Sequence, residues 1–256
     1  MAGGTFLLYF YMNFPMPRYF SRFSAAILLA FFLLETTARA DDPNPSQYDF
    51  APKIYKGRVI APAMSYLGAD WLERSDRETT EQPEKVLDTL RIAPGSVVAD
   101  IGAGTGYYSL RLAKRVGPQG RVLATDIQPE MLSRLRVNLK KAGLMNVEPI
   151  LCTPTDAKLP AGQLDLALMV DVYHELARPE ETLAQVRRAL KPDGRLVLIE
   201  YRGEDPAVPI KPEHKMTLRQ IREEVEPSGF QVQHVFDFLP RQHIVVFVTR
   251  GGGNAQ

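Results

Sequence analysis

The chain has 256 residues, of which 45% are apolar and 24% are charged, a composition typical of a soluble globular protein. It argues against a largely disordered chain and against a multi-span membrane protein. The 31 basic and 30 acidic residues leave a net charge of +1, so the basic excess typical of duplex-binding proteins is missing and no nucleic-acid partner is expected. The single cysteine excludes an intramolecular disulfide, and the spacing of the four histidines matches no zinc motif, so the sequence predicts no metal site.

An apolar run near the N-terminus has the layout of a secretory signal. Arg18 and Arg22 precede the apolar run Ala25–Leu34, and the small residues of Ala38–Ala40 follow it. A basic region, a short apolar region and small residues at the −3 and −1 positions predict cleavage before Asp41. A bilayer span needs about 20 residues, so this run is too short to cross comfortably. An uncleaved anchor and a buried helix are the alternatives.

The rest of the chain divides into an arm and one domain. We assign residues 1–40 to the signal peptide or anchor, residues 41–79 to an N-terminal arm, and residues 80–256 to the domain. The first part of the arm, Asp41–Pro62, carries four prolines and predicts an extended chain with little regular structure. Trp71, the only tryptophan, is expected to pack in a core rather than to form a lid.

Beyond the arm, short apolar runs alternate with helical patterns. The strand-like runs are Val97–Ile101, Val122–Thr125, Val147–Leu151, Leu164–Val170 and Leu196–Ile199. The helical patterns are Thr80–Leu90, Tyr107–Val116, Pro129–Ala142, Pro179–Leu190 and His214–Pro227. Two last runs, Phe230–Phe238 and Gln242–Thr249, are joined by a linker short enough for a hairpin. The pattern predicts an α/β fold: a Rossmann-like, seven-stranded, mostly parallel sheet with an antiparallel last strand and helices on both faces.

A glycine-rich loop joins the first strand to the following helix. The segment Asp100–Gly106 places Gly102, Gly104 and Gly106 where a tight turn and a close approach of a ligand to the backbone are needed. Asp126 ends the second strand, where a carboxylate can accept hydrogen bonds from both ribose hydroxyls. Together these features predict a cofactor that contains a nucleoside.

Two cofactor classes compete for this loop. Dinucleotides favour the pattern G-x-G-x-x-G, but Tyr107 stands where the third spaced glycine would be. Asp100 would repel a pyrophosphate, because like charges in a low-dielectric cleft are costly. The same carboxylate suits S-adenosylmethionine, which carries an ammonium and a sulfonium and no phosphate. The sequence therefore favours S-adenosylmethionine over NAD.

These residues resemble motif I and the later motifs of the class I S-adenosylmethionine-dependent methyltransferases. Asp100–Gly106 is similar to motif I, Thr155–Ala157 to the segment that meets the adenine amino group, and Asp171–Glu175 to the motif after strand four. The turn Ala189–Arg195 is similar to the one before strand five, and the resemblance covers about Pro83 to Arg250. It implies cofactor contacts from eight residues: Asp100, Gly102, Gly104, Gly106, Asp126, Ile127, Asp156 and Asp171.

The resemblance is specific for the superfamily and not for a substrate. Asp171–Glu175 is not the Asn-Pro-Pro-Tyr type of motif found in enzymes that methylate amino groups of bases and glutamine. The nearest general resemblance is to methyltransferases that act on quinones and other small molecules, so we expect a small or lipid-like acceptor as the partner. A non-catalytic nucleotide-binding protein of the same fold and an NAD-dependent reductase remain the alternatives.

Candidate catalytic residues follow from the topology, since ligands bind outside the carboxyl ends of parallel strands. Methyl transfer mainly requires that the nucleophile be positioned, and a base is needed only if the acceptor loses a proton early. Tyr173 and His174 are the best candidates for that base, with local hydrogen bonding as the alternative for His174. Further residues are expected at the same edge: Glu200, Tyr201, Arg202, His214, Arg241, Gln242 and His243.

The leader and the cofactor point to different compartments, because S-adenosylmethionine is made in the cytosol. We expect export, periplasmic or membrane-anchored, with the domain on the far side of the membrane. An uncleaved leader would associate the protein with the membrane through its N-terminus. If the start site is misassigned and the leader is an artefact, a cytoplasmic location is the alternative. The sequence does not indicate the oligomeric state.

Overall fold

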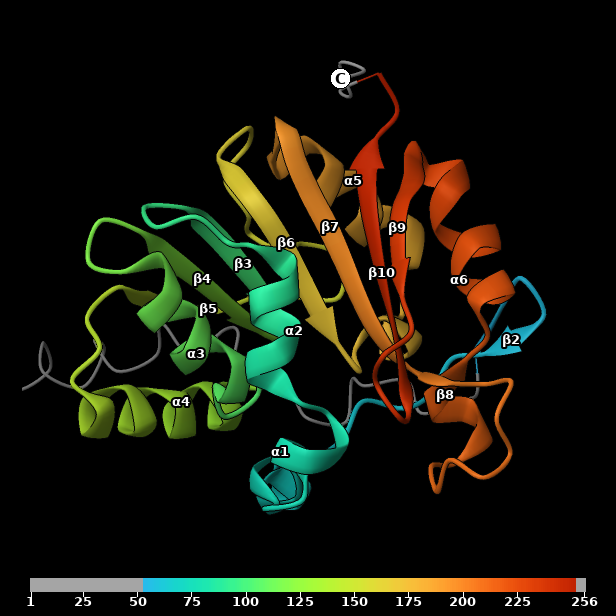
Figure 1. Ribbon diagram of the computed structural model, residues 1–256, viewed down its shortest axis with the longest axis horizontal. Coiled ribbons are helices and arrows are strands. Elements are labelled where there is room, and N and C mark those ends of the chain that lie inside the picture. Colours follow the sequence, from blue (N-terminus) through green and yellow to red (C-terminus); the bar gives the residue numbers. More distant parts are fainter. Residues whose placement is uncertain (1–52, 252–256) are drawn as a thin grey trace, which may run out of the picture. The chain divides into compact units, whose positions relative to one another are not determined.

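The computed structural model describes residues 53–251 (Figure 1). The predicted signal or anchor at residues 1–40, and the first part of the predicted arm, lie outside the described residues. Within the described part, no helix combines the length and the apolar character that crossing a bilayer would take.

One large sheet forms the centre of the described unit (Figure 1). Its strands follow the order β5-β4-β3-β6-β7-β10-β9, with the short β8 paired to β7. The strands are β3 (Val97–Ile101), β4 (Arg121–Asp126), β5 (Val147–Leu151), β6 (Leu164–Val170), β7 (Leu190–Arg202), β8 (Lys215–Met216), β9 (Phe230–Phe236) and β10 (Gln242–Thr249). β10 runs antiparallel to both β7 and β9, while the pairs from β5 to β7 are parallel. The α/β class and the antiparallel last strand are confirmed, and β8 brings the sheet to eight strands instead of the seven predicted.

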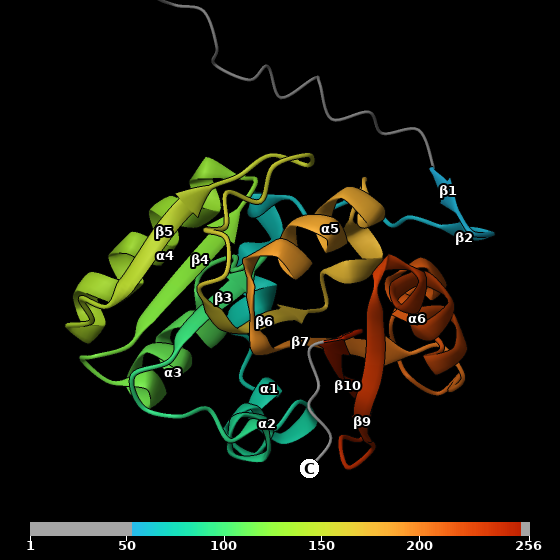
Figure 2. The ribbon, with the colours of Figure 1, turned by 90° about the horizontal axis from the view of Figure 1, so that it is seen from above.

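Helices cover both faces of the sheet, as the alternating pattern predicted (Figure 2). The helices are α1 (Arg77–Thr80), α2 (Pro83–Leu90), α3 (Tyr107–Val116), α4 (Pro129–Ala142), α5 (Pro179–Ala189) and α6 (Leu218–Val225). Apolar side chains of α2 and α3 pack with one another on one face, where α4 also packs against β4, and those of α5 and α6 pack on the other. Because strand residues alternate between these clusters, the sheet is buried on both sides.

The last helix begins later than its sequence pattern suggested. α6 starts at Leu218 because Thr217 caps it: the Thr217 hydroxyl accepts from the Gln220 backbone N–H, and the Gln220 side chain accepts from the Thr217 N–H. The preceding residues pair with β7 as β8, with Lys215 opposite Tyr201. This pairing holds the His214 end of the loop at the carboxyl end of β7.

The described part of the predicted arm contains more regular structure than expected. β1 (Ile54–Tyr55) and β2 (Arg58–Val59) form a small hairpin whose two turn residues both have positive φ. Arg58 is buried and makes two hydrogen bonds of 2.9 Å to the Glu224 carboxylate on α6. The hairpin is therefore tied to the domain by a buried ion pair.

The tryptophan prediction was wrong. Trp71 lies in the 3₁₀ helix Tyr66–Glu73, and its side chain is 41% exposed, with the Arg74 guanidinium 3.6 Å from its ring centroid. The helix lies against the glycine loop: a Cβ on Gly104 would come within 2.8 Å of Leu72 Cδ1. A lone tryptophan usually anchors apolar surface, but here the neighbouring arginine covers its face.

Candidate active site

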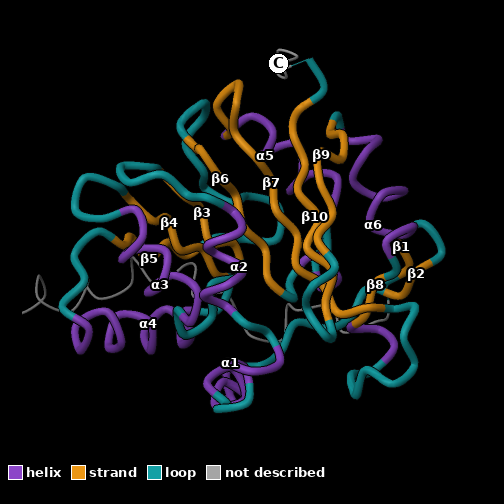
Figure 3. The backbone as a smooth tube through the Cα atoms, viewed as in Figure 1, coloured by secondary structure: helices purple, strands orange, loops and turns teal. Residues whose placement is uncertain are grey.

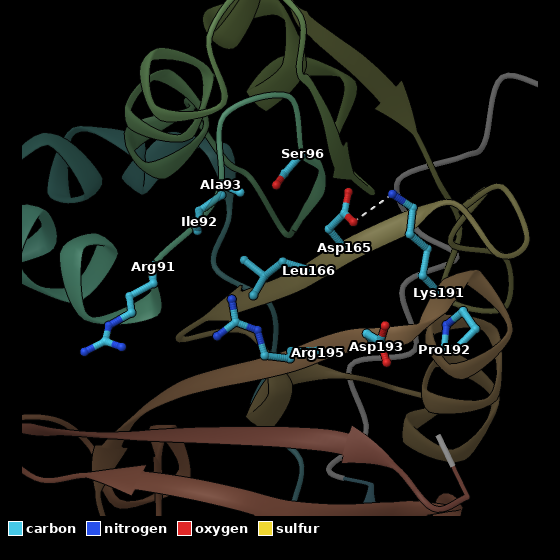
Figure 4. Close-up of a pocket in the computed structure, with 10 residues that line it drawn as sticks. All are labelled: Arg91, Ile92, Ala93, Ser96, Asp165, Leu166, Lys191, Pro192, Asp193 and Arg195. Carbon is cyan, nitrogen blue, oxygen red and sulfur yellow. Dashed lines mark hydrogen bonds and ion pairs between the residues drawn. The ribbon is translucent and has the colours of Figure 1, made fainter. Parts of the chain in front are cut away.

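The loops that follow the parallel strands gather at one edge of the sheet, the lower edge in Figure 3. The segment from Tyr66 to Glu81 lies over this edge, and its backbone bonds directly to the loop after β4, where Gln128 Oε1 accepts from the Tyr66 N–H at 2.8 Å. A shallow hollow exists at the opposite edge, among the amino ends of β3, β6 and β7 (Figure 4). Six of its ten lining residues are polar or charged, among them the Asp165–Lys191 ion pair of 2.7 Å. Because ligands of open α/β sheets bind outside the carboxyl ends of the strands, we place the candidate site at those ends.

The glycine loop adopts a backbone that side chains would disrupt. Gly102, Gly104 and Gly106 have φ of +70°, +54° and +93°, in the left-handed region that favours glycine. A Cβ on Gly102 would lie 2.5 Å from a Val172 methyl, and one on Gly106 would lie 2.2 Å from Leu135 Cδ1. Gly102 and Gly106 therefore leave no room for a side chain within the loop. A side chain at Gly104 would contact only Leu72 of the 3₁₀ helix.

Asp126 joins the second strand to the glycine loop. Its Oδ2 accepts from the Gly104 N–H at 2.9 Å, and its Oδ1 accepts from the Gln128 N–H at 2.8 Å. The side chain is buried, and burial raises the pKa of Asp126 although these backbone donors oppose the rise. The Ile127 N–H also hydrogen-bonds to this carboxylate, so of its about four acceptor positions one remains for a ribose hydroxyl.

Asp100 places a second buried carboxyl beside the first. It is 3% exposed and accepts a hydrogen bond of 2.5 Å from the Ser109 hydroxyl on α3. Burial raises the pKa of Asp100 to about 6, and the charge of Asp126 adds to the rise. Ionising a buried carboxyl beside another carboxylate costs free energy, and a cationic ligand bound next to Asp100 would lower that cost.

The loop and its acids fit S-adenosylmethionine better than a dinucleotide. The glycines bring bare backbone to the surface of the site, and Asp100 and Asp126 offer negative charge and acceptors where a pyrophosphate would be repelled. Ile127 is half-buried directly after Asp126. Asp156 is exposed and accepts from the Lys158 N–H at 2.9 Å, so its side chain is engaged in its own turn.

The other half of the edge is formed by side chains from β6, β7 and β10. Asp171 follows β6 with a φ of +53°, and the Gln242 amide donates to both oxygens of its carboxylate at 3.0 and 2.9 Å. Burial raises the pKa of Asp171 well above its usual value, and the charges of Glu81 and Glu200 raise it further. Gln242 Oε1 is buried without a hydrogen-bond partner in the part of the chain that the structure describes, which leaves an acceptor for a ligand.

A buried glutamate that the sequence did not reveal connects this half to the 3₁₀ helix segment. Glu81 is fully buried, and its carboxylate binds Arg74 and, at 2.7 Å, Arg77. The Tyr201 hydroxyl donates to the same carboxylate at 3.1 Å. Glu81 lies at the end of α1, where no motif marks it, so only its contacts across the fold identify it.

The two predicted catalytic residues occupy different environments. His174 is 2% exposed, its Nδ1 lies 2.6 Å from Glu200 Oε2, and its Nε2 lies 3.1 Å from His214 Nδ1. Burial, the largest single cause, would lower the pKa of His174, but the charge and hydrogen bond of Glu200 together with the charges of Glu175 and Asp171 raise it overall. Tyr173 is fully buried in the apolar cluster of α5 and α6. The side chains of Tyr173 and His174 therefore have different surroundings although the residues are adjacent in the chain. Their catalytic role stays a prediction.

Two further residues expected at this edge, Arg202 and His243, bond to each other and to neighbouring loops. His243 Nε2 lies 2.8 Å from Glu204 Oε2, and its Nδ1 lies 3.3 Å from Arg202 Nη1. Arg202 also donates to the carbonyl oxygens of Asp237 and Leu239. These contacts fix the loop between β9 and β10 and do not reach the glycine loop.

Comparison with known proteins gives relatives for this architecture. A family model for a methyltransferase domain matches residues 98–194, which contain the glycine loop, Asp126 and His174. The chain is 34% identical over 111 residues to the ubiquinone/menaquinone biosynthesis C-methyltransferase UbiE of Cupriavidus taiwanensis, covering 43% of this chain and 45% of that protein. It is 35% identical over 146 residues to an uncharacterized 37.1 kDa protein in a transposon of Streptomyces fradiae, covering 56% of this chain and 41% of the other. The chain thus spans less than half the length of these curated relatives.

Solved structures of other proteins resemble this fold over most of the described residues. A methyltransferase from Aquifex aeolicus that depends on S-adenosylmethionine matches with a TM-score of 0.70 and 28% identity, covering 73% of this chain and 100% of that one. The cyclase SpnF matches with a TM-score of 0.57 at 15% identity, covering 67% of this chain and 81% of its own, a likeness that shows the fold alone. Residues 98–194 thus match a methyltransferase domain, and the glycine loop with its two acids is similar to that of class I S-adenosylmethionine-dependent methyltransferases.

Proposed function

We propose that this protein transfers a methyl group from S-adenosylmethionine to a small-molecule acceptor. The observation that carries the proposal is the buried Asp100 beside the glycine loop, because its carboxylate would repel a phosphate-bearing cofactor, whereas Asp126 suits the ribose of either cofactor class. The matches to methyltransferases support it. Fold alone does not imply function, so the argument rests on this local chemistry.

The chain's own residues bind and orient the cofactor. The glycine backbone allows close approach, Asp126 accepts a hydrogen bond from the ribose, and Asp100 supplies the charge that attracts the ammonium. When bound, S-adenosylmethionine supplies a methyl group activated by the adjacent sulfonium. The transfer is an in-line displacement, so most of the rate comes from holding the acceptor in line with that methyl.

The acceptor would lie on the other half of the edge. Asp171, Glu81 and Glu200 place carboxyl groups there, and Gln242 Oε1 remains free to accept a hydrogen bond from a ligand within the described structure. Such a set suits an acceptor that presents hydroxyl groups. Quinols have this chemistry, and the named relative UbiE is a C-methyltransferase of ubiquinone/menaquinone biosynthesis, so we propose a quinol-like or similar lipid-like phenolic acceptor.

A labelling experiment tests this function. The purified chain is incubated with S-adenosylmethionine labelled in its methyl group and a panel of demethylated quinols and simple phenols, and the products are measured by mass spectrometry. The proposal expects one labelled methyl per product molecule with the wild-type chain and none with Asp100→Asn. Tight cofactor binding without transfer to any quinol or phenol would contradict the proposed acceptor class. Absence of cofactor binding would contradict the function itself.

A further inference from the structure

Three side chains that could ligate a metal meet beside the site. His174 Nε2, His214 Nδ1 and Glu175 Oε1 all lie within 4.8 Å of one another. His174 and Glu175 come from the 3₁₀ helix after β6, and His214 ends another short 3₁₀ helix forty residues away. Because no local spacing links the two histidines, the sequence predicted no metal here.

The distances suit a single small ion between the three atoms. Zn–N bonds are about 2.0–2.1 Å, so two histidine nitrogens on a tetrahedral ion lie about 3.3 Å apart. The observed separation of His174 Nε2 and His214 Nδ1 is 3.1 Å. Glu175 Oε1 lies 3.8 Å from the first nitrogen and 3.7 Å from the second. Small rotations of Glu175 would therefore complete three corners of a tetrahedron.

Glu200 supplies the support that a metal-bound histidine normally has. Histidine ligands donate their second ring N–H to a carboxylate or carbonyl, which fixes the tautomer and the ring orientation. Glu200 is fully buried and lies 2.6 Å from His174 Nδ1, so the proton belongs on Nδ1 and the Nε2 lone pair faces His214. Glu200 also accepts from the Tyr173 N–H at 2.8 Å, which holds its carboxylate in place.

The backbone around His174 is equally fixed. Its carbonyl oxygen accepts from Arg58 Nη1 at 2.9 Å and from the Ala61 N–H at 3.1 Å. His174 is 2% exposed, whereas the side chain of His214 is 24% exposed. One ligand is thus preorganised inside the fold, and the other lies where an ion can enter.

We propose that His174, Glu175 and His214 bind one divalent transition-metal ion, with Zn²⁺ as the representative. Two imidazoles and one carboxylate suit zinc and its neighbours rather than calcium or magnesium, which prefer all-oxygen sites. Three protein ligands leave one position for water or for an oxygen of the acceptor. A metal-bound His174 Nε2 takes no proton, so this site and a general-base role for His174 exclude each other.

A metal titration of the whole chain tests the proposal. Protein without a polyhistidine tag is treated with chelator, dialysed and titrated with Zn²⁺ by calorimetry, and Co²⁺ is added in parallel to record visible absorption. One Zn²⁺ per chain and the intense bands of four-coordinate Co²⁺ are expected. His214→Ala should weaken zinc binding at least 100-fold, and Glu175→Gln should also weaken it. Glu200→Gln should weaken it about 10–100-fold, as outer-shell changes do.

Matched controls separate this site from other sources of binding. His234→Ala removes an exposed histidine elsewhere, and Cys152→Ser removes the only thiol, so both variants should bind zinc as the wild type does. Circular dichroism melts establish that each variant is folded. Wild-type protein that binds no zinc, or a folded His214→Ala variant with unchanged affinity, would overturn the proposal, because a plain hydrogen bond between the rings would then explain the geometry. S-adenosylhomocysteine titrations of the same samples show independently whether the proposed methyltransferase function fails.

Discussion

The two halves of the site edge are constructed in different ways. The half at β3 and β4 uses backbone: the glycine loop turns through positive φ angles, and Asp126 is held by the N–H groups of Gly104 and Gln128. The half at β6, β7 and β10 uses side chains from distant segments, such as the bond between Glu81 and Tyr201. A backbone site is encoded within a few residues, whereas a side-chain network exists only after the whole sheet has formed.

The largest effect is expected in the side-chain half. Glu81→Ala leaves Arg77, which is 5% exposed, without its carboxylate partner in the interior. Breaking a buried ion pair in this way costs about 3–5 kcal/mol of unfolding free energy, which urea denaturation measures. Glu78→Ala is the control, because Glu78 pairs with Arg111 at the surface and its loss should cost about 1 kcal/mol or less. Equal losses for the two variants would mean that Glu81 does not organise this half.

In the backbone half, Gly104→Val should abolish cofactor binding. A β-branched residue is strained at the φ of +54°, and its side chain enters the space between the loop and Leu72. We expect at least a 100-fold loss of affinity for S-adenosylhomocysteine in calorimetry, with a folded domain. Gly162→Val is matched to it, since Gly162 has a φ of +64° and nothing within 4 Å of a Cβ. If both variants bind equally well, the glycine loop is not the cofactor site.

Asp126→Ala tests the link between β4 and the glycine loop. Losing hydrogen bonds to a charged group costs about 1–3 kcal/mol, which corresponds to roughly 5- to 150-fold in affinity for S-adenosylhomocysteine. Asp156→Ala is expected to change affinity little, because Asp156 is exposed and bonded within its own turn. A larger effect at Asp156 than at Asp126 would place the nucleoside elsewhere.

The pH dependence of binding follows from Asp100. With its pKa raised to about 6, the carboxyl is largely protonated at pH 5 and ionised at pH 7. The ionised form attracts the cofactor's ammonium, so the affinity for S-adenosylhomocysteine should rise up to about tenfold between these values and then level off. Without ligand the sign is opposite: because the folded state holds the proton more tightly, stability from this group is lost as the pH rises through about 6. Asp100→Asn should remove the binding trend and only the Asp100 share of the stability trend, because burial also raises the pKa of Asp126 and Asp171; retention of the binding trend would assign it to another group.

Sequence patterns predicted the parts of the fold that depend on neighbours in the chain. β3, β5, β6, β10, α3 and α4 have the predicted bounds, because apolar periodicity, Pro129 and Gly143 act locally. Predictions at the ends of patterns were wrong: α6 begins at a cap after the short β8 rather than at His214, α2 begins at Pro83 rather than at Thr80, and β7 spans Leu190–Arg202 rather than Leu196–Ile199. Apolar periodicity alone does not show that the capping box at Thr217 starts the helix and that the residues before it form a strand.

The same division applies to the site. Asp100 and Asp126 were found because Asp100 precedes the glycine loop at the carboxyl end of β3 and Asp126 ends β4, which are short-range signals. The sequence did not reveal Glu81 or the contact between His174 and His214, because Glu81 and His214 lie in no motif and the contact forms only when separate loops pack together. The exposed position of Trp71 was missed for a related reason: Arg74, three residues along, covers the ring that would otherwise seek a core.

The most direct test of the account compares two cofactors on one protein. Wild-type chain and the Asp100→Asn variant are each titrated by calorimetry with S-adenosylhomocysteine and with NAD⁺. The account predicts one binding site for S-adenosylhomocysteine on the wild type, a loss of that binding in Asp100→Asn, and no binding of NAD⁺ to the wild type. Binding of NAD⁺ without binding of S-adenosylhomocysteine, or full affinity in the folded Asp100→Asn variant, would contradict it.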